Sequence, residues 1–291
     1  ALAWWQGALP AWACIPLVAV FASITHEIEH DLIHLLYGRR RRWLNHLMLA
    51  LAWLARPSTI NPWLRRHLHF NHHKNSGTPV DIEERAITNG ERWGVARLLM
   101  TVDAGASVLL RAARAPSWKA RWRHLWRPAA AYFPLGWIHW GLWWSFLLQS
   151  AALAVADLTG EALPWQAALA GWWPWHVALI VTWVAPNVLR SACLHFVSSN
   201  MHYYGDVRPG NLIQQCQVLD AWWLWPAQLF CFNFGATHAI HHFVVGQPFY
   251  LRQWVAPRVL PAMIALGVRH NDLASLRRAN RWSTPRLDAA A

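Results

Sequence analysis

Histidine is the residue whose number and spacing in this chain point to chemistry. Twelve of the 17 histidines fall in four short clusters. In the first cluster, His26-Glu-Ile-Glu-His30-Asp-Leu-Ile-His34, a spacing of four residues places the three rings on one face of a helix. The second and fourth clusters share the pattern HxxHH, which again puts the rings on one face. The members of the remaining clusters are His67, His69, His72 and His73; His195 and His202; and His238, His241 and His242.

Imidazoles clustered in this way are typical ligands of zinc, copper, iron or nickel. The four cysteines form no CxxC pair and lie in apolar stretches, so we interpret them as buried thiols rather than metal ligands. Three helices that each offer two or three imidazoles supply more ligands than one tetrahedral zinc ion uses. Two metal ions about 3.5–6.5 Å apart would use them, the shorter separation being usual in two-metal enzymes. Among the possible metals we favour redox-active iron.

The clusters define a set of predicted site residues. The ligands that we predict are His26, His30, His69, His72, His73, His202, His238, His241 and His242. His34, His67 and His195 are additional candidates, for which a surface or packing role is the alternative. Glu27, Asp31 and Asp81, and also Glu29, are candidates to accept hydrogen bonds from imidazole N–H groups and so orient the rings. The isolated histidines, which we interpret as structural, are His46, His124, His139, His176 and His270.

The composition indicates that helices within a membrane position these histidines. Only 14% of the 291 residues are charged, 55% are hydrophobic and 24 are Trp. Windows without Asp, Glu, Lys or Arg predict three spanning helices, over residues 8–24, 134–153 and 167–186. Residues 43–55 are too few to cross a membrane and are expected to lie in the interface. Residues 221–251 contain histidines and amides, and we expect them to pack within the protein or to lie in the interface. We therefore predict an all-α integral membrane protein with about three to four membrane-spanning or membrane-embedded helices.

The distribution of positive charge predicts an orientation. The net charge is +12, with 17 Lys and Arg between residues 39 and 127, nine from residue 190 onward and none between residues 156 and 166. If the second and third spans form a hairpin, all 26 cations lie on one side, which the positive-inside rule makes cytoplasmic. All four histidine clusters fall on the same side and can converge on one metal site. Membrane topology thus accounts for the charge without a nucleic-acid partner, and we expect a location in a bacterial inner membrane.

Two parts of the chain are distinguished by composition. Residues 1–260 are predicted to form the membrane domain, and residues 261–291 a cytoplasmic C-terminal helix and loose tail. The segment before His26 lacks the charged region of a signal peptide, so we expect it to be a true span. A further helix preceding it is an open alternative, because the chain begins with Ala rather than Met.

The order of the histidine boxes resembles that of the membrane fatty-acid desaturase and hydroxylase superfamily. His26/His30 matches its HxxxH box, and the groups His69/His72/His73 and His238/His241/His242 match its two HxxHH boxes. His202 matches an extra histidine that the family uses ahead of the last box, and the resemblance covers roughly residues 10 to 255. It implies a non-haem diiron centre, molecular oxygen as co-substrate, a lipid or fatty-acyl substrate and an external electron donor of the ferredoxin or rubredoxin type with its reductase.

The branch within this superfamily is less clearly marked. The segment from His72-His73 to Thr78-Pro79-Val-Asp81 is similar to the alkane monooxygenase pattern HH…TPxD, but His202-Tyr-Tyr-Gly205 departs from that branch's NYxxHYG. We therefore favour desaturation of a fatty-acyl or lipid hydrocarbon chain, with hydroxylation of an alkane, fatty acid or other lipid as the alternative. A membrane zinc hydrolase needs fewer ligands, and a metal transporter would place its histidines near the bilayer midplane, so both are less favoured.

Overall fold

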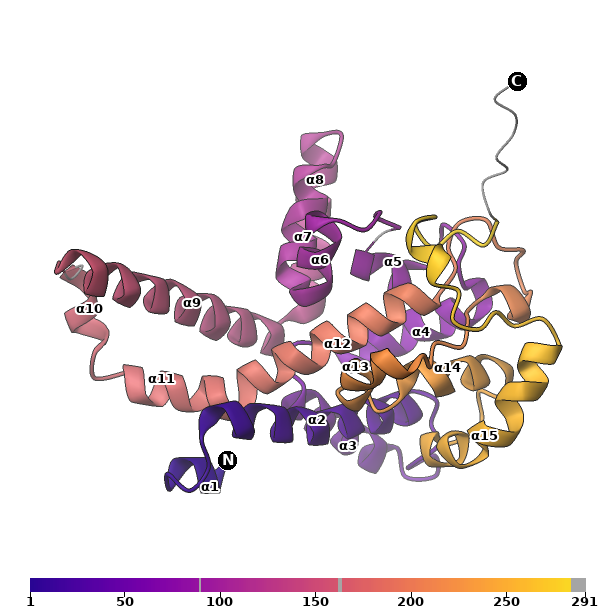
Figure 1. Cartoon of the computed structure of the whole chain (residues 1–291), viewed down its shortest axis with the longest axis horizontal. Coiled ribbons are helices and arrows are strands. Elements are labelled where there is room, and N and C mark those ends of the chain that lie inside the picture. Colours follow the sequence, from indigo (N-terminus) through magenta and orange to yellow (C-terminus); the bar gives the residue numbers. More distant parts are fainter. Residues whose placement is uncertain (89, 162–163, 284–291) are drawn as a thin grey trace.

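The computed structural model describes residues 1–88, 90–161 and 164–283, and within these ranges every element is helical apart from two isolated β-bridges (Figure 1). The first eight helices are α1 Leu2–Trp5, α2 Ala11–Ile33, α3 Arg42–Ala55, α4 Pro62–Asn75, α5 Ile82–Thr88, α6 Val95–Val102, α7 Ala104–Ala113 and α8 Trp118–Tyr132. They are followed by α9 Leu135–Thr159, α10 Pro164–Leu169, α11 Trp173–Leu179, α12 Ala185–Met201, α13 Trp225–Leu229, α14 Phe234–Phe243 and α15 Phe249–Ala265. The predicted all-α fold is confirmed.

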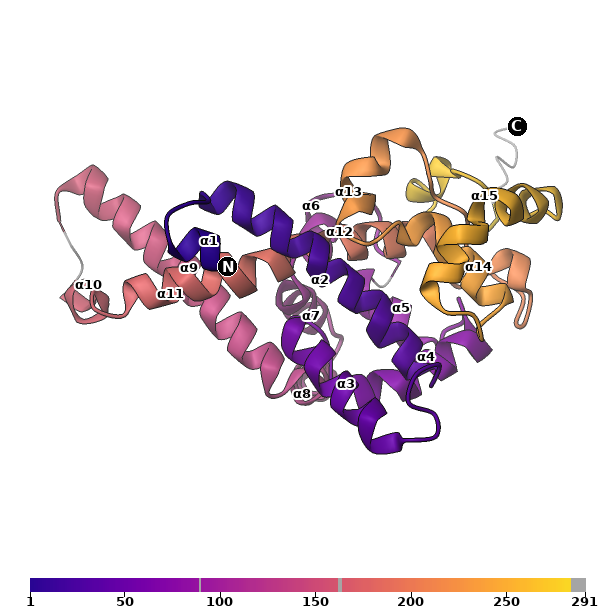
Figure 2. The same cartoon turned by 90° about the horizontal axis from the view of Figure 1, so that it is seen from below.

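Three helical runs are long and apolar enough to cross a membrane. They are Ala11–Ile33, Leu135–Thr159 and Trp173–Met201, the last of which joins α11, a π-helical turn and α12. The chain is thus a membrane protein with the predicted number of spans. Helices α9 and α11, linked through α10, form an arm that reaches away from the rest of the molecule (Figures 1 and 2).

The third span begins later and ends later than predicted. The predicted span, which ended at Pro186, was taken from a window without Asp, Glu, Lys or Arg. Proline is disfavoured inside a helix, because it lacks an N–H group and its ring crowds the carbonyl four residues earlier. The structure instead has a π-helical turn over Ile180–Val184, and Pro186 lies in the first turn of α12, where a missing N–H is tolerated. The helix therefore continues to Met201 and delivers its C-terminal residues to the histidine clusters.

The first span also extends further than its apolar stretch. Helix α2 begins after Pro10 and continues through the first histidine cluster to Ile33. It packs against α3, α4 and α12. Because the C-terminal ends of both α2 and α12 carry cluster histidines, these residues meet at the same end of the two spans.

The two segments that were expected not to span behave accordingly. Helix α3 has 14 residues, and residues 221–251 are divided among a 3₁₀ turn, α13, α14 and the start of α15. Helix α14 is buried from Phe234 to His242. Its environment is protein, which offsets the cost of placing three histidines in an apolar stretch.

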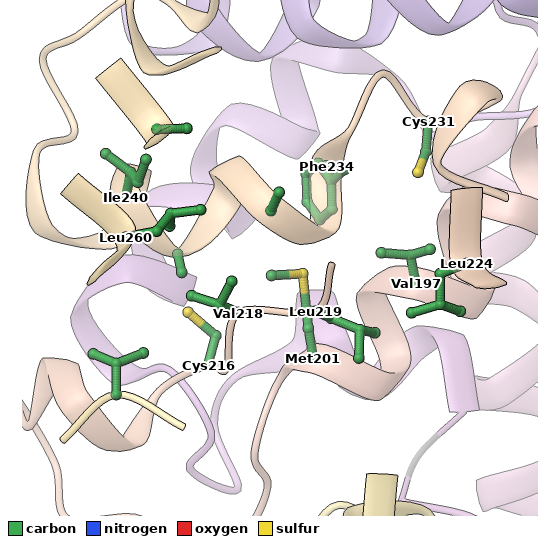
Figure 3. Packing of buried hydrophobic residues seen from close by; sticks show 14 of the residues in the cluster. Val197, Met201, Cys216, Val218, Leu219, Leu224, Cys231, Phe234, Ile240 and Leu260 are labelled. Atoms are coloured by element: carbon green, nitrogen blue, oxygen red, sulfur yellow. The ribbon is translucent and has the colours of Figure 1, made fainter. Parts of the chain in front are cut away.

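A hydrophobic cluster joins α12, α14 and α15 (Figure 3). It contains Val197 and Met201 of α12, Phe234 and Ile240 of α14, and Leu260 of α15. This packing fixes the end of α12 relative to α14, and therefore the positions of the histidines on these two elements.

After α15, the described part of the C-terminal region consists of turns, bends and a 3₁₀ turn over Leu273–Leu276. Helix α15 runs across residue 260, where we divided the chain, so the domain division stays a prediction. Residues 284–291 of the predicted tail lie outside the described residues. The four cysteines are free; Cys14, Cys216 and Cys231 are buried and Cys193 is half-buried.

Candidate metal centre

Histidines of all four clusters come together at the ends of α2, α4, α12 and α14. Their ring nitrogens form two groups, in each of which one nitrogen per residue lies within 4.8 Å of every other. The first group is His30, His34, His69, His73 and His241. The second group is His72, His202, His238 and His242. The groups adjoin, since the ring centroids of His73 and His242 are 5.1 Å apart.

The helical spacing of the boxes distributes their members between the groups. Asn61 caps the start of helix α4, because its side chain accepts hydrogen bonds from the backbone N–H groups of Trp63 and Leu64. Of its box, His69 and His73 are four residues apart and join the first group, whereas His72 joins the second. Helix α14 divides its box in the opposite sense. There His238 and His242 join the second group and His241 joins the first.

Within the groups, Nε2 atoms of different histidines face one another at short range. In the first group, Nε2 of His73 lies 3.0 Å from Nε2 of His69 and 2.8 Å from Nε2 of His241. In the second group, Nε2 of His242 lies 3.1 Å from Nε2 of His238 and 3.4 Å from Nε2 of His72. These contacts converge on one point in each group.

The opposite ring nitrogens face hydrogen-bond acceptors. Nδ1 of His72 lies 2.9 Å from a carboxylate oxygen of Asp81, and Nδ1 of His69 lies 2.9 Å from one of Glu83. The Nδ1 atoms of His202 and His242 lie 2.9 Å from the carbonyl oxygen of Ser198 and 2.8 Å from Oε1 of Gln215, respectively. Each of these acceptors stabilises the tautomer that carries its proton on Nδ1.

This tautomer leaves a bare lone pair on Nε2. Lone pairs that face one another about 3 Å apart repel, unless a cation between them accepts both. Both ring nitrogens of His30 and Nδ1 of His241 are buried without a protein hydrogen-bond partner, which again leaves donor atoms for an ion. The donor set is all imidazole, which suits iron, zinc, copper or nickel. The residues thus fit two metal ions, one for each group.

Burial keeps these imidazoles neutral, as metal ligands must be. Desolvation, reinforced by the charge that His69 would carry, lowers the pKa of His34 to about 3. Burial likewise lowers the pKa of His73 to about 2, with His69 as the next cause. The pKa values of His238, His241 and His242 also lie well below the ordinary value, and burial is again the main cause. At neutral pH the lone pairs are therefore available to metal without a competing proton.

Eight of the nine predicted ligands belong to the two groups, and His34, an additional candidate, is the ninth member. His26 lies outside both groups. Its ring packs against Phe234, with centroids 5.5 Å apart, and its centroid lies 6.4 Å from that of His30. Both ring nitrogens of His26 are buried without a protein hydrogen-bond partner, as are those of His30. Of the three histidines at the end of α2, His30 and His34 are the two that belong to the first group.

The other candidate histidines stand apart from the groups. His67 is exposed on α4, and Nδ1 of His195 lies 3.3 Å from the carbonyl oxygen of Thr101. The five isolated histidines also lie outside both groups. One of them, His176, lies 2.9 Å from the carbonyl oxygen of Leu142 through Nε2, which is a helix-packing role.

Among the predicted carboxylates, Asp81 contacts the predicted ligand His72, whereas Glu27 and Asp31 pair with an arginine. Arg252 of α15 donates to both Glu27, at 3.0 Å, and Asp31, at 3.3 Å, and so ties α15 to α2. Glu29 accepts hydrogen bonds from Arg56 and Arg65. These three acids thus hold helices together.

Sequence reasoning missed Glu83 and Gln215. Arg65 donates to Glu29 at 3.0 Å and to Glu83 at 3.2 Å, and Glu83 faces His69, so one chain of charges links α2, α4 and α5 to the centre. Glu83 lies two residues after Asp81, and this proximity was the available signal. Gln215 lies far along the chain in a loop, and no local pattern marks it.

A cavity with a volume of about 1240 Å³ reaches the two groups. His30, His69, His72 and His238 line its inner end. The wall beyond them is mainly apolar and includes Ile60, Leu64, Leu68, Met100, Val108, Leu194 and Phe234. A hydrocarbon chain can therefore lie with one of its carbons beside the candidate metal centre.

The comparisons with known proteins bear on the same region. A family model described as fatty acid desaturase matches residues 6–274, which include both histidine groups and the cavity. No curated protein and no solved structure matches the chain.

Proposed function

The chain belongs to the fatty acid desaturase family, and we propose that it desaturates a fatty-acyl or lipid hydrocarbon chain by means of a diiron centre and molecular oxygen. The observation that carries this proposal is the pair of adjoining imidazole groups whose Nε2 atoms face one another at the end of an apolar cavity. Two bound irons would supply the activation of oxygen that removal of hydrogen from an unactivated carbon requires.

The residues of the two groups act as the ligands in this proposal. His30, His34, His69, His73 and His241 would hold one iron, and His72, His202, His238 and His242 the other. Asp81, Glu83 and Gln215 fix the tautomer and ring orientation of the imidazoles that they contact. His26 has no place among the ligands in this assignment.

The cavity holds the hydrocarbon chain and excludes water. Because no polar group marks one methylene of a chain over another, the carbon attacked is chosen by where the chain lies. Met100 and Leu194 line the wall, and Phe234 approaches the inner end beside His238, with ring centroids 4.1 Å apart. These side chains would position the reacting carbon and keep water from the centre.

Hydroxylation is the alternative outcome at the same site, and the segment similar to the alkane monooxygenase pattern does not favour it. The carboxylate of Asp81 accepts a hydrogen bond from the backbone N–H of Gly77 and contacts His72, while the backbone N–H of Asp81 donates to Thr78. The segment therefore serves to orient a ligand. This role is equally useful for desaturation and hydroxylation.

We further propose the setting in which the enzyme works. Electrons would come from a separate donor of the ferredoxin or rubredoxin type with its reductase. The chain would lie in a bacterial inner membrane with the metal centre at the cytoplasmic face. Apart from Arg190, which lies within the third span, the arginines and lysines fall in the segments between the first and second spans and after the third, where the histidine clusters also gather.

Lipid analysis of expressing cells tests the activity. Cells would carry the wild-type chain, His241→Ala or His46→Gln, and all would be aerated and supplied with a matching donor. His46 is exposed on α3 and lies outside both groups, so it provides the control. Acyl chains that lack two hydrogens are expected in the wild type and the control, and not in His241→Ala.

Chains with one additional oxygen would assign the protein to hydroxylation. Normal desaturation in His241→Ala would overturn the site assignment. Metal analysis of the purified chain separates the remaining classes. About two irons per chain are expected, whereas tightly bound zinc without oxygen uptake would indicate a hydrolase or a metal transporter.

A further inference from the structure

His202 is the first residue after α12, and the end of this helix needs hydrogen-bond donors from outside it. The last four carbonyl groups of an α-helix find no N–H partner within the helix itself. Gln217 serves two of them in α12. Its backbone N–H donates to the carbonyl oxygen of Met201 at 2.8 Å, and its side chain donates to that of Asn200 at 2.9 Å. The carbonyl oxygen of Ser198 faces the ring of His202. One carbonyl of the last turn, and that of His202, then depend on another part of the chain.

Asn280, in the C-terminal segment, supplies both of these contacts. Its side-chain NH₂ group donates to the carbonyl oxygen of Ser199 and, at 3.2 Å, to that of His202. Its backbone carbonyl accepts a hydrogen bond from the backbone N–H of Tyr204 at 2.8 Å. The segment, yellow in Figure 1, therefore lies against the end of α12, and Asn280 is only 4% exposed. Asn280 thus holds the backbone on both sides of His202, which fixes the direction from which the ring enters the second group.

Arg97 of α6 fixes the orientation of the Asn280 amide. Its guanidinium group donates to Oδ1 of Asn280 at 3.2 Å through both terminal nitrogens. It also donates to Oδ1 of Asn200 at 2.6 Å and to the carbonyl oxygen of Ser199 at 3.0 Å. Arg97 is fully buried, so its charge has to be met by acceptors of this kind. If the amide were turned over, its NH₂ group would face the guanidinium and its oxygen would face the two carbonyls, so only one orientation satisfies all the groups.

A second residue of the same segment supports this end of α12. The backbone N–H of Asp272 donates to Oε1 of Gln217 at 2.6 Å, and its carboxylate accepts a hydrogen bond from the hydroxyl of Tyr203 at 2.7 Å. The segment therefore also holds Gln217, which donates to two carbonyls of α12. Asn280 itself lies beyond the end of the match to the family model, at residue 274. The contact to His202 is thus made by a part of the chain outside the histidine boxes and outside the matched residues.

We infer that Asn280 is a positioning residue of the second histidine group. By holding the backbone on both sides of His202, it keeps this ring directed at the other three imidazoles of the group. This part of the C-terminal region, for which we predicted a helix and loose tail, in this way completes the candidate metal centre. The role of Asn280 rests on the proposed function only in that the second group binds a metal ion. It is independent of which metal is bound and of the reaction.

Titration of the purified, metal-free chain with Fe²⁺, without oxygen and against a chelator of known affinity, measures this role. Asn280 has a φ angle of +60°, which glycine adopts without strain, so Asn280→Gly removes the side chain and keeps the backbone conformation. Asn280→Asp keeps an acceptor for Arg97 but has no N–H to donate to the carbonyl of His202. In both variants the affinity of one of the two iron sites should fall by about tenfold to a hundredfold, and that of the other should be unchanged.

A second substitution identifies the affected site. His34→Gln impairs the first group, so the iron that this variant retains is expected in the second group. The double variant His34→Gln/Asn280→Gly should therefore bind the remaining iron about tenfold to a hundredfold more weakly than His34→Gln does. A merely structural role of Asn280 would instead weaken both sites of the wild-type chain alike.

Asn271→Gly is the matched control. Asn271 lies in the same segment with a φ angle of +49°, and its side chain accepts hydrogen bonds from the backbone N–H groups of Asp220 and Ala221, each at 3.0 Å. The variant loses the same kind of side chain and a comparable set of hydrogen bonds, but none of these partners belongs to either histidine group. It should be less stable than the wild type, yet bind both irons with wild-type affinity.

Three outcomes would overturn the role of Asn280. Both iron sites could keep their affinity in Asn280→Gly and Asn280→Asp, the double variant could bind iron as tightly as His34→Gln, or Asn271→Gly could lose as much affinity as Asn280→Gly. The proposed function fails separately. If the wild type binds zinc and takes up no oxygen, that function is rejected, whereas loss of affinity for one of two zinc ions in Asn280→Gly would leave the role of Asn280 standing. A wild-type chain that binds no metal ion would reject both.

Discussion

At the scale of single residues, we predict opposite effects on iron content for substitutions of His26 and His34. His34 belongs to the first histidine group, and His26 belongs to neither. His34→Gln should therefore lower the iron content from about two to about one per chain. His26→Gln, the matched control on the same helix, should retain both irons. Elemental analysis of the purified variants measures this. Loss of iron in His26→Gln with normal content in His34→Gln would restore the pair His26/His30.

The same two residues show how much of the site the sequence could predict. The run His26-x-x-x-His30-x-x-x-His34 contains two overlapping HxxxH pairs, and spacing alone places all three rings on one helix face. The choice between them depends on where α2 ends. It ends at Ile33, so His34 follows the last helical residue and meets His69, at 3.0 Å between Nε2 atoms. That contact joins residues 35 positions apart, which no local pattern specifies.

At the scale of elements, α14 can position its histidines only because its first turn approaches other backbone closely. A Cβ atom at Gly235 would lie 2.4 Å from the carbonyl oxygen of Leu219 and 2.4 Å from the side-chain nitrogen of Gln228. Gly235→Ala should therefore displace α14, destabilise the protein by about 1–3 kcal/mol and reduce iron binding. Thermal unfolding and iron content measure the two effects.

Gly246→Ala is the control for this prediction, because a Cβ atom there meets nothing within 4 Å. It should unfold like the wild type and keep its iron. Equal behaviour of the two variants would show that the close approach at Gly235 does not hold α14 in place.

The elements themselves were largely predictable from hydropathy, and the exceptions have physical causes. Residues 221–251 lack charged side chains like a span, yet their histidines and amides predicted that they pack within the protein or lie in the interface. In the structure the histidine-bearing part, Phe234 to His242, is buried in protein. The helix of the third span continues beyond the predicted end at Pro186 to Met201, and a π-helical turn precedes this proline. Helix α8 was not recognised, although its Trp and cationic stripes at intervals of four residues are visible in the sequence.

At the scale of the whole molecule, the membrane topology predicted that the histidine clusters converge, but not how their members divide between the two groups. The number of membrane crossings predicted that all four histidine clusters lie on one side of the membrane. The structure brings histidines of all four clusters into one region. The division of each HxxHH box between two groups could not be predicted. It depends on how α4 and α14, which are far apart in the sequence, lie relative to each other, and the hydrophobic cluster that joins α12, α14 and α15 fixes the position of α14. The helices whose histidines meet at the centre therefore depend on one another for their positions.

Because the histidines of the centre are buried and neutral, the stability of the metal-free protein should depend on pH. Folding lowers the pKa of His34 to about 3 and of His73 to about 2, mainly through burial, whereas an unfolded chain has ordinary imidazoles with a pKa near 6.5. Below about pH 6.5 the unfolded chain takes up protons that the folded chain cannot, so the free energy of unfolding falls as the pH falls. The loss is at most about 1.4 kcal/mol per such histidine for each pH unit.

Thermal unfolding of the metal-free chain should therefore occur at lower temperature at pH 5.5 than at pH 7.5. The variant His34→Gln/His73→Gln should show a smaller difference, because two of the titrating groups are gone. An unfolding temperature that is constant or rises on acidification would contradict the buried, neutral state of the centre.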